Sequence, residues 1–414
     1  MSTPKTVSII GAGLSGLTLA LALHQQGITC TLYEMRSAPL DIGGAIMLSP
    51  NALRILDALG VYSRIRSKAY NFEKLYFRTE DNKPADSYEF GGVQKYGYAA
   101  LRIYRNVLIT ELSTMVADAG VEIKYHKKFN CVIQETESSV TCQFEDGTIA
   151  TSTVLVGADG IHSKVRKYMY PDLEPIFTKS MGVSAAVPTT QLQLETAEPE
   201  GYDLPVTIMN KTHGAFVMAL QQPDGHETFI GRQKRAPELD RAGWDALLND
   251  KEWCVDYLRE NISSFPAVAQ NAVSAINTDT INIWPFYVVP KLDRWASEFQ
   301  RVVMLGDAAH AIPPTAGQGI NQAFEDVFTF AFVLGRCGGD DPDLARGLTV
   351  WQRGRQERID RVLELNAQID KRRLPKVAGA AGEVEVEDEP FELGWLYAPD
   401  FGEMVEGWLK GEGL

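Results

Sequence analysis

Three glycines and one acid near the start of the chain have the types and spacing of a dinucleotide-binding site. Gly11, Gly13 and Gly16 follow a β-branched run in a G-x-G-x-x-G spacing, and Glu34 comes eighteen residues after the last glycine. Glycines permit a tight turn and let the backbone approach a pyrophosphate, whose charge the free N–H groups of a helix N-terminus stabilise. A carboxylate at Glu34 can accept hydrogen bonds from both ribose hydroxyls and would repel a 2′-phosphate. The spacing therefore favours FAD or NAD over NADP.

The elements that must position these residues are a strand, a helix and a second strand within residues 7–36. Because residues 7–23 carry no charge, a signal-peptide core or a membrane helix is the alternative. Three glycines interrupt that stretch, its basic flank is a single lysine, and no small-residue cleavage site follows, so we favour the dinucleotide unit. Ser15 and Met35 join the candidate cofactor contacts. Arg36 joins them too, with a plain exposed arginine as the alternative.

Composition and charge exclude several classes of protein. The chain has 414 residues, of which 45% are hydrophobic and 23% charged, which is ordinary globular usage with room for two or three domains. The formal net charge of −14 argues against nucleic-acid binding, since a negative field repels phosphate backbones. No stretch resembles a membrane span. Five scattered cysteines without a C-x-x-C pair or zinc spacing indicate reduced thiols in a cytoplasmic protein that holds no metal.

Periodicity divides the chain into helical and strand-forming stretches. A glycine turn at 43–44 precedes an amphipathic helix that ends near Gly60 and is capped by Ser49 or Asn51. The other predicted elements are short strands at 62–98, a helix at 102–119, a strand at 120–129, a β-meander at 131–156 with a turn at Asp146–Gly147, an antiparallel sheet at 181–285 with a helix at 243–262, a buried strand from Arg301, helices at 320–334 and 348–371, and a linker at 377–390.

Two further segments place an aspartate after a buried strand. In VLVGADGIHSKVR (154–166) the strand delivers Asp159 to a turn, and a simple turn-forming role is equally open. In VVMLGDAAHAIPPTAGQGINQAFEDV (302–327) a glycine and Asp307 end a strand before a helix. A carboxylate there can accept a hydrogen bond from a ribityl hydroxyl, and the alternative is a helix cap. We interpret His310 in the same motif as a structural histidine rather than a general base.

The loop that follows Asp307 is suited to a flat ring. Residues 313–319 begin with two prolines and end with two glycines, so a stiff segment leads into a flexible one whose backbone can lie against a planar group. The helix from Ile320 points its positive end at the same place. Its dipole, roughly half an elementary charge, would stabilise negative charge near N1 and the C2 carbonyl of a reduced flavin.

Together the three motifs, in this order and spacing, resemble the fingerprints of the class A flavoprotein monooxygenases, the single-component aromatic hydroxylases, and in particular their salicylate-hydroxylase-like branch. The likeness also covers GGAIMLSPNALRIL (43–56), IYRNVLITEL (103–112) and WLYAPDF (395–401), so it spans nearly the whole chain.

The resemblance implies an α/β fold in which a Rossmann-like FAD-binding domain, of the glutathione-reductase-like and hydroxybenzoate-hydroxylase type, is interrupted by an antiparallel-sheet substrate domain and followed by C-terminal helices. The implied divisions are 1–70, 100–180 and 286–340 for the FAD-binding domain, 71–99 and 181–285 for the substrate-binding domain, and 341–414 for the C-terminal helix and tail.

The resemblance also implies contacts with FAD. Arg105 would reach the phosphate or ribose, with a surface helix arginine as the alternative. Asp159 would help to hold the ribose, near the path of the nicotinamide. The candidate FAD contacts are Gly11, Gly13, Ser15, Gly16, Glu34, Met35, Arg36, Gly44, Ala45, Arg105, Asp159, Gly306, Asp307, Pro314, Gly317, Gly319, Ile320 and Asn321.

The activity implied by the resemblance is a monooxygenation. NAD(P)H reduces FAD, O2 adds at C4a, and the C4a-hydroperoxyflavin hydroxylates an aromatic or other electron-rich small molecule. No second G-x-G-x-x-G follows a strand, which fits a nicotinamide that binds transiently, and Gly43 and Gly44 would line the path of a mobile isoalloxazine. One alternative is an epoxidase or rearranging oxygenase of secondary metabolism that acts on an alkene, indole or polyketide. A remote alternative is a non-enzymatic binding protein of the same dinucleotide fold.

Candidate substrate contacts come from the antiparallel sheet. Alternation gives this sheet one face over the flavin, although most single aromatic residues in it belong to the core. The candidates are His213, Phe216, Met218, Phe229, Arg232, Trp284, Phe286 and Tyr287. Arg232, His213 and Tyr287 are selected as pocket residues. A cation at either of the first two would favour a phenolate or carboxylate, and forming a phenolate activates a ring toward electrophilic oxygen.

Overall fold

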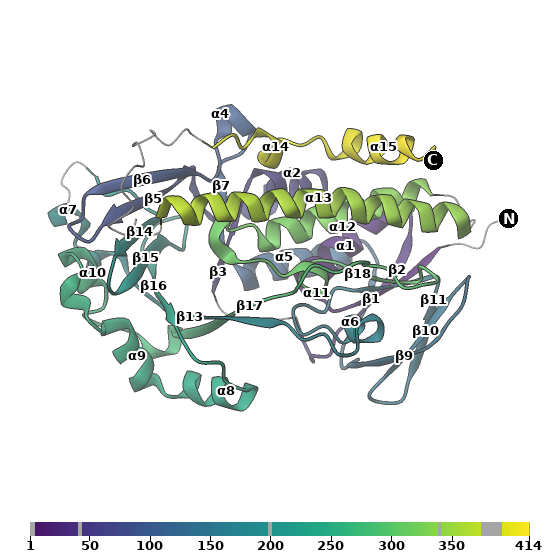
Figure 1. Cartoon of the computed structure of the whole chain (residues 1–414), viewed down its shortest axis with the longest axis horizontal. Coiled ribbons are helices and arrows are strands. Elements are labelled where there is room, and N and C mark those ends of the chain that lie inside the picture. Colours follow the sequence, from purple (N-terminus) through teal and green to yellow (C-terminus); the bar gives the residue numbers. More distant parts are fainter. Residues whose placement is uncertain (1–4, 40–43, 198–200, 338–340, 374–390, 414) are drawn as a thin grey trace, which may run out of the picture.

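The structure is a computed structural model that describes residues 5–39, 44–197, 201–337, 341–373 and 391–413. A parallel sheet with its helices and a larger, mostly antiparallel sheet lie next to each other, and the long helix α13 (Asp341–Arg373) runs along both (Figure 1). This mixed architecture of a Rossmann-like sheet and an antiparallel sheet confirms the predicted fold class.

Five parallel strands form the sheet that carries the glycine turn, in the order β18–β12–β1–β2–β8. The strands are β1 (Thr6–Ile10), β2 (Thr29–Tyr33), β8 (Glu122–Lys124), β12 (Val154–Gly157) and β18 (Val302–Met304). β12 and β18 are buried throughout, as expected for parallel strands covered on both faces. Because neighbouring strands run in the same direction, the loops that follow β1, β2, β12 and β18 meet at one edge of the sheet.

Helices cover this sheet. Residues 16–23 of α1 are buried on every side of the helix, and α1 packs against α5 and α12. The helices of this part are α1 (Leu14–Gln25), α2 (Pro50–Ala58), α3 (Tyr62–Ile65), α4 (Val93–Tyr96), α5 (Arg105–Asp118), α6 (Lys164–Met169), α11 (Asp307–His310) and α12 (Gly319–Arg336). Ser49 is the N-cap residue of α2, as predicted, but its hydroxyl donates to Asn51 and makes no capping bond.

The predicted meander is confirmed up to Ser152, whereas its last predicted residues, 154–156, belong to β12 of the parallel sheet. It consists of β9 (Phe129–Glu135), β10 (Val140–Phe144) and β11 (Ile149–Ser152), which pair in sequence order. The turn between the last two passes through Gly147 at a φ of 81°, which glycine adopts without strain.

A small sheet replaces part of a predicted helix. The sheet has the order β3–β7–β4, with β3 (Ala45–Leu48), β4 (Tyr70–Phe72) and β7 (Ala100–Tyr104). The helix predicted at 102–119 therefore begins only at Arg105 as α5, and the three residues before it belong to a strand. Pairing with a strand on each side outweighs the helical spacing of residues 102–104, because tertiary contacts override local propensity.

Seven strands form the second large sheet, in the order β17–β13–β16–β15–β14–β5–β6. They are β5 (Lys74–Thr79), β6 (Pro84–Glu89), β13 (Ile176–Pro188), β14 (Val206–Asn210), β15 (Gly214–Leu220), β16 (Glu227–Arg235) and β17 (Asn282–Val288). Its helices are α7 (Leu194–Ala197), α8 (Arg241–Asn249), α9 (Lys251–Arg259) and α10 (Ala267–Ala272). α9 and α10 cover one face, where Leu258 and Val268 share a core with Val183 and Ile230.

The C-terminal helices pack on the first part of the chain. The predicted charged helix at 348–371 lies within α13, and α14 (Gly394–Tyr397) and α15 (Phe401–Gly411) follow. The predicted linker at 377–390 and Gly43 lie outside the described residues. No helix in the described ranges is both long and apolar enough to cross a membrane.

Alanine substitution at two helical glycines should have opposite effects. A Cβ at Gly354 of α13 would lie 2.2 Å from Cε2 of Trp408 on α15, whereas a Cβ at Gly407 would meet nothing within 4 Å. Alanine is favoured over glycine inside a helix by about 1 kcal/mol, so Gly407→Ala should raise the free energy of unfolding by roughly that amount. Overpacking should make Gly354→Ala destabilising by about 1–3 kcal/mol. Urea unfolding measures both variants, and effects of the same sign would contradict the packing of α15 on α13.

Candidate functional site

The parallel sheet brings the three sequence motifs into contact. Gly11, after β1, has a φ of 103°, and a Cβ on it would lie 2.6 Å from the carbonyl oxygen of Ala158, after β12. A Cβ on Gly306, after β18, would lie 3.3 Å from Oγ of Ser15 in the glycine turn. Within the turn itself, a Cβ on Gly16 would lie 1.9 Å from the carbonyl oxygen of Gly11. The three turns therefore form one backbone-lined edge in which a side chain at Gly11 or Gly16 would have no room.

Glu34 is fixed beside the glycine turn. The residue is 4% exposed, and Oε2 accepts a hydrogen bond of 3.0 Å from the Ala12 N–H. Oε1 accepts from the backbone N–H and the guanidinium of Arg36, at 2.9 and 3.1 Å. Met35 between them is exposed, and Gly13 has open space where a Cβ would be. The acid and the open glycine suit the adenosine end and the pyrophosphate of a dinucleotide.

Asp159 both caps a helix and retains a free acceptor. Its Oδ2 accepts the N–H groups of Lys164 and Val165, at 2.8 and 3.1 Å, at the start of α6. Its Oδ1 is buried and has no hydrogen-bond partner among the described residues. Burial raises the pKa of Asp159, and hydrogen bonds from Ser163 and the backbone oppose that rise. The two roles that the sequence left open are therefore compatible, because each uses a different oxygen.

Arg166 ties the second motif to the third, and sequence reasoning did not select it. The side chain is 0% exposed, and its guanidinium donates to the carbonyl oxygens of Ala308 and Ile161, at 3.0 and 2.6 Å. The signal that could have identified it is an arginine placed within the first turn of the helix that follows the Asp159 turn.

Asp307 and Arg105 face each other across the motifs. The Asp307 side chain is accessible to solvent, yet protein atoms surround it closely, and the resulting desolvation raises its pKa while His310 and Arg105 oppose the rise. The Arg105 guanidinium lies 5.4 Å from the ring centroid of Trp284, and its Nε has no acceptor in the described part of the chain. The Arg105 N–H donates to the carbonyl oxygen of Gly44, at 3.1 Å. A cation and an accessible carboxylate thus lie beside the glycine turns.

The proline-glycine loop is held from three sides. Gly317 is left-handed at a φ of 63° and lies against Phe90, whose Cε2 would be 2.8 Å from a Cβ there. The Ala316 N–H donates to Asn366 of α13, at 2.8 Å. Asn321 donates to the carbonyl oxygen of Gly317, at 2.7 Å, and accepts the Ser49 N–H, at 2.9 Å.

The other predicted loop contacts lie close to this support. Pro314 is exposed, Ile320 is half-buried, Gly319 has open space where a Cβ would be, and Ala45 begins β3 beside Gly44. The loop therefore presents backbone at the positive end of α12.

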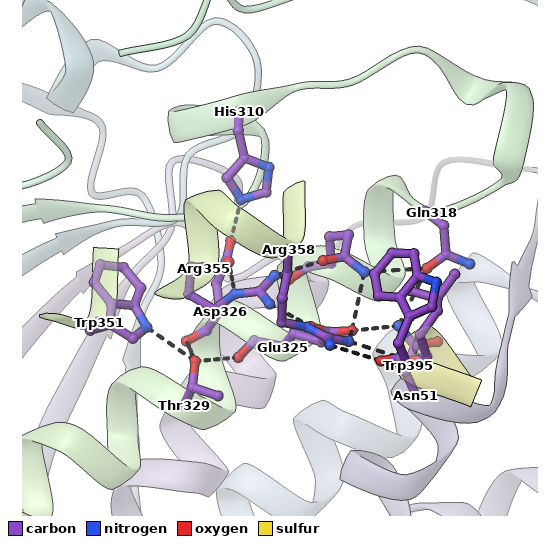
Figure 2. Close-up of polar contacts among 12 residues, drawn as sticks. Asn51, His310, Gln318, Glu325, Asp326, Thr329, Trp351, Arg355, Arg358 and Trp395 are labelled. Atoms are coloured by element: carbon purple, nitrogen blue, oxygen red, sulfur yellow. Dashed lines mark hydrogen bonds and ion pairs between the residues drawn. The ribbon is translucent and has the colours of Figure 1, made fainter. Parts of the chain in front are cut away.

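A buried ion network lies directly behind these turns (Figure 2). Oδ2 of Asp326 accepts the Gly306 N–H at 2.8 Å and lies 2.5 Å from Nε2 of His310. Oδ1 of Asp326 accepts Nε of Arg355 at 2.8 Å. Burial alone would raise the pKa of Asp326, but His310 and Arg355 outweigh it and lower the pKa. His310 therefore contacts a buried carboxylate, as expected for a histidine with a structural role.

Glu325 extends the network to the C-terminal segment. It pairs with Arg355, and it accepts two hydrogen bonds from Arg358, at 2.5 and 2.8 Å. It also accepts a hydrogen bond of 2.7 Å from Asn51. Arg358 in turn donates to the carbonyl oxygen of Trp395, at 2.9 Å. Sequence reasoning missed this network because its arginines sit on a helix whose charged sequence suggests a solvated surface.

Three of the predicted substrate contacts lie on the face of the second sheet that helices cover. Phe216, Met218 and Arg232 point to the face covered by α9 and α10. The Arg232 guanidinium donates to the backbone oxygens of Glu260 and His213 and lies over Phe265. Alternation defines two faces but not which one the helices cover, so the expected substrate role of Arg232 is not retained.

The other face of that sheet meets the cofactor motifs. It carries Phe229 and Trp284, which lie beside Arg102 and Arg105 of the first part of the chain. Tyr287 accepts a hydrogen bond of 3.3 Å from Trp244, and its ring packs edge-on against His162, three residues after Asp159. The His213 side chain is half-buried just before β15, and the His213 backbone donates to Asn210 and accepts from Arg232.

Comparison with known proteins identifies the fold and its cofactor. Residues 5–338 match the family model described as an FAD binding domain. The chain is 27% identical over 378 residues to 3-amino-4-hydroxybenzoate 2-monooxygenase PtmB3 of Streptomyces platensis, covering 88% of this chain and 87% of that protein. It is 25% identical over 377 residues to 6-hydroxynicotinate 3-monooxygenase of Pseudomonas fluorescens, covering 88% and 91%. The crystal structure of Klebsiella pneumoniae HpxO complexed with FAD and uric acid has a TM-score of 0.74 at 20% identity, covering 98% and 92%.

A methyl group at Gly13 should impair cofactor binding and spare the fold. Because a Cβ there meets nothing within 4 Å, Gly13→Ala should change the unfolding free energy of the FAD-free protein by no more than about 1 kcal/mol. A pyrophosphate against this backbone would collide with the methyl group, so we expect FAD affinity to fall by about tenfold to a hundredfold. Titration of the FAD-free protein, followed by flavin fluorescence, measures the change, with Gly407→Ala as the control. Unaltered affinity in Gly13→Ala would place the pyrophosphate elsewhere.

Loss of the Asp326 charge should destabilise the fold in a pH-dependent way. The folded-state pKa of Asp326 is lowered, so its stabilisation is present above the unfolded value of about 4 and is lost as the pH falls through the folded value. Asp326→Asn should lower the free energy of unfolding by about 3–5 kcal/mol at neutral pH, because it leaves Arg355 and His310 without this partner. The free energy of unfolding should also fall less steeply toward acidic pH. Asp360→Asn, which breaks an exposed pair with Lys291, should cost less than about 1 kcal/mol. Thermal unfolding across pH tests this, and equal losses in the two variants would refute it.

Proposed function

This chain belongs to the FAD-binding family of class A flavin-dependent aromatic hydroxylases, and on that premise we propose that it uses NAD(P)H and O2 to hydroxylate an aromatic or other electron-rich small molecule. The observation that carries the proposal is the contact between the turns after β1, β12 and β18, which makes one backbone-lined edge for one cofactor. Since the relatives are named monooxygenases, the non-enzymatic alternative is not retained.

The residues at this edge fit FAD in three ways. An open position at Gly13 suits a pyrophosphate, an unpartnered buried oxygen on Asp159 suits a hydroxyl donor, and an accessible carboxylate on Asp307 suits the ribityl chain. We propose that FAD contacts the glycine turn, Glu34 and Arg105, as well as the remaining candidate residues named from the sequence. We likewise retain the proposed domain division, with the FAD-binding domain formed by 1–70, 100–180 and 286–340.

When bound, FAD supplies hydride acceptance from NAD(P)H and the activation of O2 at its C4a position. The chain would supply orientation and charge. The N–H groups at the start of α12 point their partial positive charge toward the loop at 313–319, where they would stabilise negative charge on the ring. Arg105 would add a full positive charge, because arginine stays protonated in proteins even though burial lowers the pKa of this guanidinium.

The chain would also keep water from the ring. Behind the loop, Phe90 stacks with Phe72 and packs against Tyr397, so Gly317 rests on a buried aromatic cluster rather than on solvent. Exclusion of water protects reactive intermediates of the reaction from wasteful breakdown. Asn366 fixes the same loop by donating to the carbonyl oxygen of Pro313 and accepting from the Ala316 N–H, so the loop beside the proposed ring position is itself held in place.

Substrate-stimulated NAD(P)H oxidation tests the proposed function. Purified protein should be yellow with bound FAD, and in a panel of phenols, hydroxybenzoates, indoles and alkenes at least one phenol or hydroxybenzoate should accelerate NAD(P)H and O2 consumption. Hydroxylated product should account for most of the NAD(P)H, with little hydrogen peroxide. The Asp360→Asn variant should behave as the wild type, because it lies on an exposed ion pair. A protein that binds no FAD, or one whose oxidation yields only hydrogen peroxide with every compound, would contradict the proposal.

A further inference from the structure

Arg102 is a buried cation without a carboxylate partner in the described part of the chain. Its side chain lies on β7 and the residue is 5% exposed. One Nη donates to Oε1 of Gln221 at 3.0 Å, Nε has no acceptor, and the guanidinium lies 4.7 Å from the ring centroid of Phe229. The buried Arg355, in contrast, is paired with two carboxylates. Arg102 therefore lacks the compensation that buried charges ordinarily have.

The position of Arg102 places it against the substrate side of the second sheet. Leu101 and Ile103 on either side of it belong to the core of the FAD-binding part, so Arg102 points the other way. Its partner Phe229 lies on the face opposite Arg232, the same face that carries Trp284, over which Arg105 rests. The two arginines thus meet the same sheet face, one over each aromatic ring.

On that sheet face β13 carries only small side chains between the two rings, and the Phe286 ring of β17 lies beside Gly182, where a Cβ would be 3.5 Å from its Cζ. β13 separates β16 from β17, and its residues on this face are Gly182, Ser184 and Ala186. Gly182 and Ser184 are only half-buried. The Phe229 ring lies across Gly231, where a Cβ would be 2.8 Å from Cζ. A planar molecule could lie on this floor with Arg102 at one border.

The groups around Arg102 offset its charge only partly. Gln221 offers a dipole and donates to the Tyr104 hydroxyl at 2.9 Å, and the Phe229 ring adds a cation–π contact. The carboxylate of Glu227 is bonded by that same Tyr104 hydroxyl and forms no pair with Arg102. Burial lowers the pKa of Arg102 to about 10, which leaves the guanidinium charged at neutral pH. A bound anion would supply the missing partner.

We propose that Arg102 binds a carboxylate carried by the aromatic substrate, with the ring of that substrate on the floor between Phe229 and Trp284. Nε has no acceptor, and the Nη that donates to Gln221 carries a second N–H, so the guanidinium can offer two adjacent donors, which match the two oxygens of a carboxylate better than the single oxygen of a phenolate. This inference rests on the proposed function and names the class of its substrate, and it assigns the anion to a strand of the FAD-binding part rather than to Arg232.

Matched acids and amides test this assignment by binding. The FAD-loaded protein is titrated with a panel of hydroxybenzoates and, for each, the corresponding primary amide, and binding is followed by the change in flavin absorbance. Wild type should bind the best hydroxybenzoate at least about tenfold more tightly than its amide. Arg102→Met should lose that preference, and Arg232→Met, a buried arginine on the other face of the same sheet, should keep it. Equal affinity for acid and amide in wild type, binding of no acid at all, or an unchanged preference in Arg102→Met would each overturn the proposal.

A second variant separates binding from folding. Gln221→Glu places a carboxylate beside Arg102, so the melting temperature should rise while the preference for the acid disappears. If Arg102 served only to stabilise the fold, Gln221→Glu would leave the preference intact. FAD content and NAD(P)H oxidation are measured on the same samples, so a failure of the proposed function appears as a loss of either. If only the present inference fails, FAD content and NAD(P)H oxidation are both normal, and only the expected preference for the acid is absent.

Discussion

The parallel pairing of β18, β12, β1 and β2 is the constraint on which the site depends. In this register Ile10 lies opposite Gly157 and Tyr33, and Gly157 lies opposite Met304. Each strand therefore ends at the same level, and segments that are separated by up to 300 positions in the chain meet within a few residues of these ends. The absence of side chains at Gly11, Gly16 and Gly306 then lets the turns touch, as one cofactor bound by all three would require.

The buried ion network transmits this arrangement to the C-terminal helices. Asp326 holds the turn at Gly306, and Glu325, its neighbour on α12, holds two arginines of α13. Buried pairs add little net stability over apolar packing, but breaking one leaves an uncompensated charge. The network therefore favours one placement of α12 relative to the Gly306 turn, and that placement aims the positive helix end at the loop beside the proposed flavin ring.

The sequence could select residues that the fold brings to one edge of the parallel sheet, but it could not say which face of the second sheet its residues occupy. Glycine spacing and acids after strands are local signals, so Gly11 to Gly16, Glu34, Asp159 and Asp307 could be selected before their positions were known. Arg232 was misplaced because a period of two does not say which face the helices cover. Arg102 was read as the start of a helix because three residues of strand carry too little pattern to outweigh the helical spacing that follows.

A crystal structure of the protein with FAD tests the central claim most directly. The account predicts the pyrophosphate over the turn that contains Gly13, a ribityl hydroxyl within hydrogen-bond distance of Asp307, and the isoalloxazine against the backbone of residues 314–319. An FAD molecule that touched only one of the three turns, or one whose ring lay away from the start of α12, would contradict it.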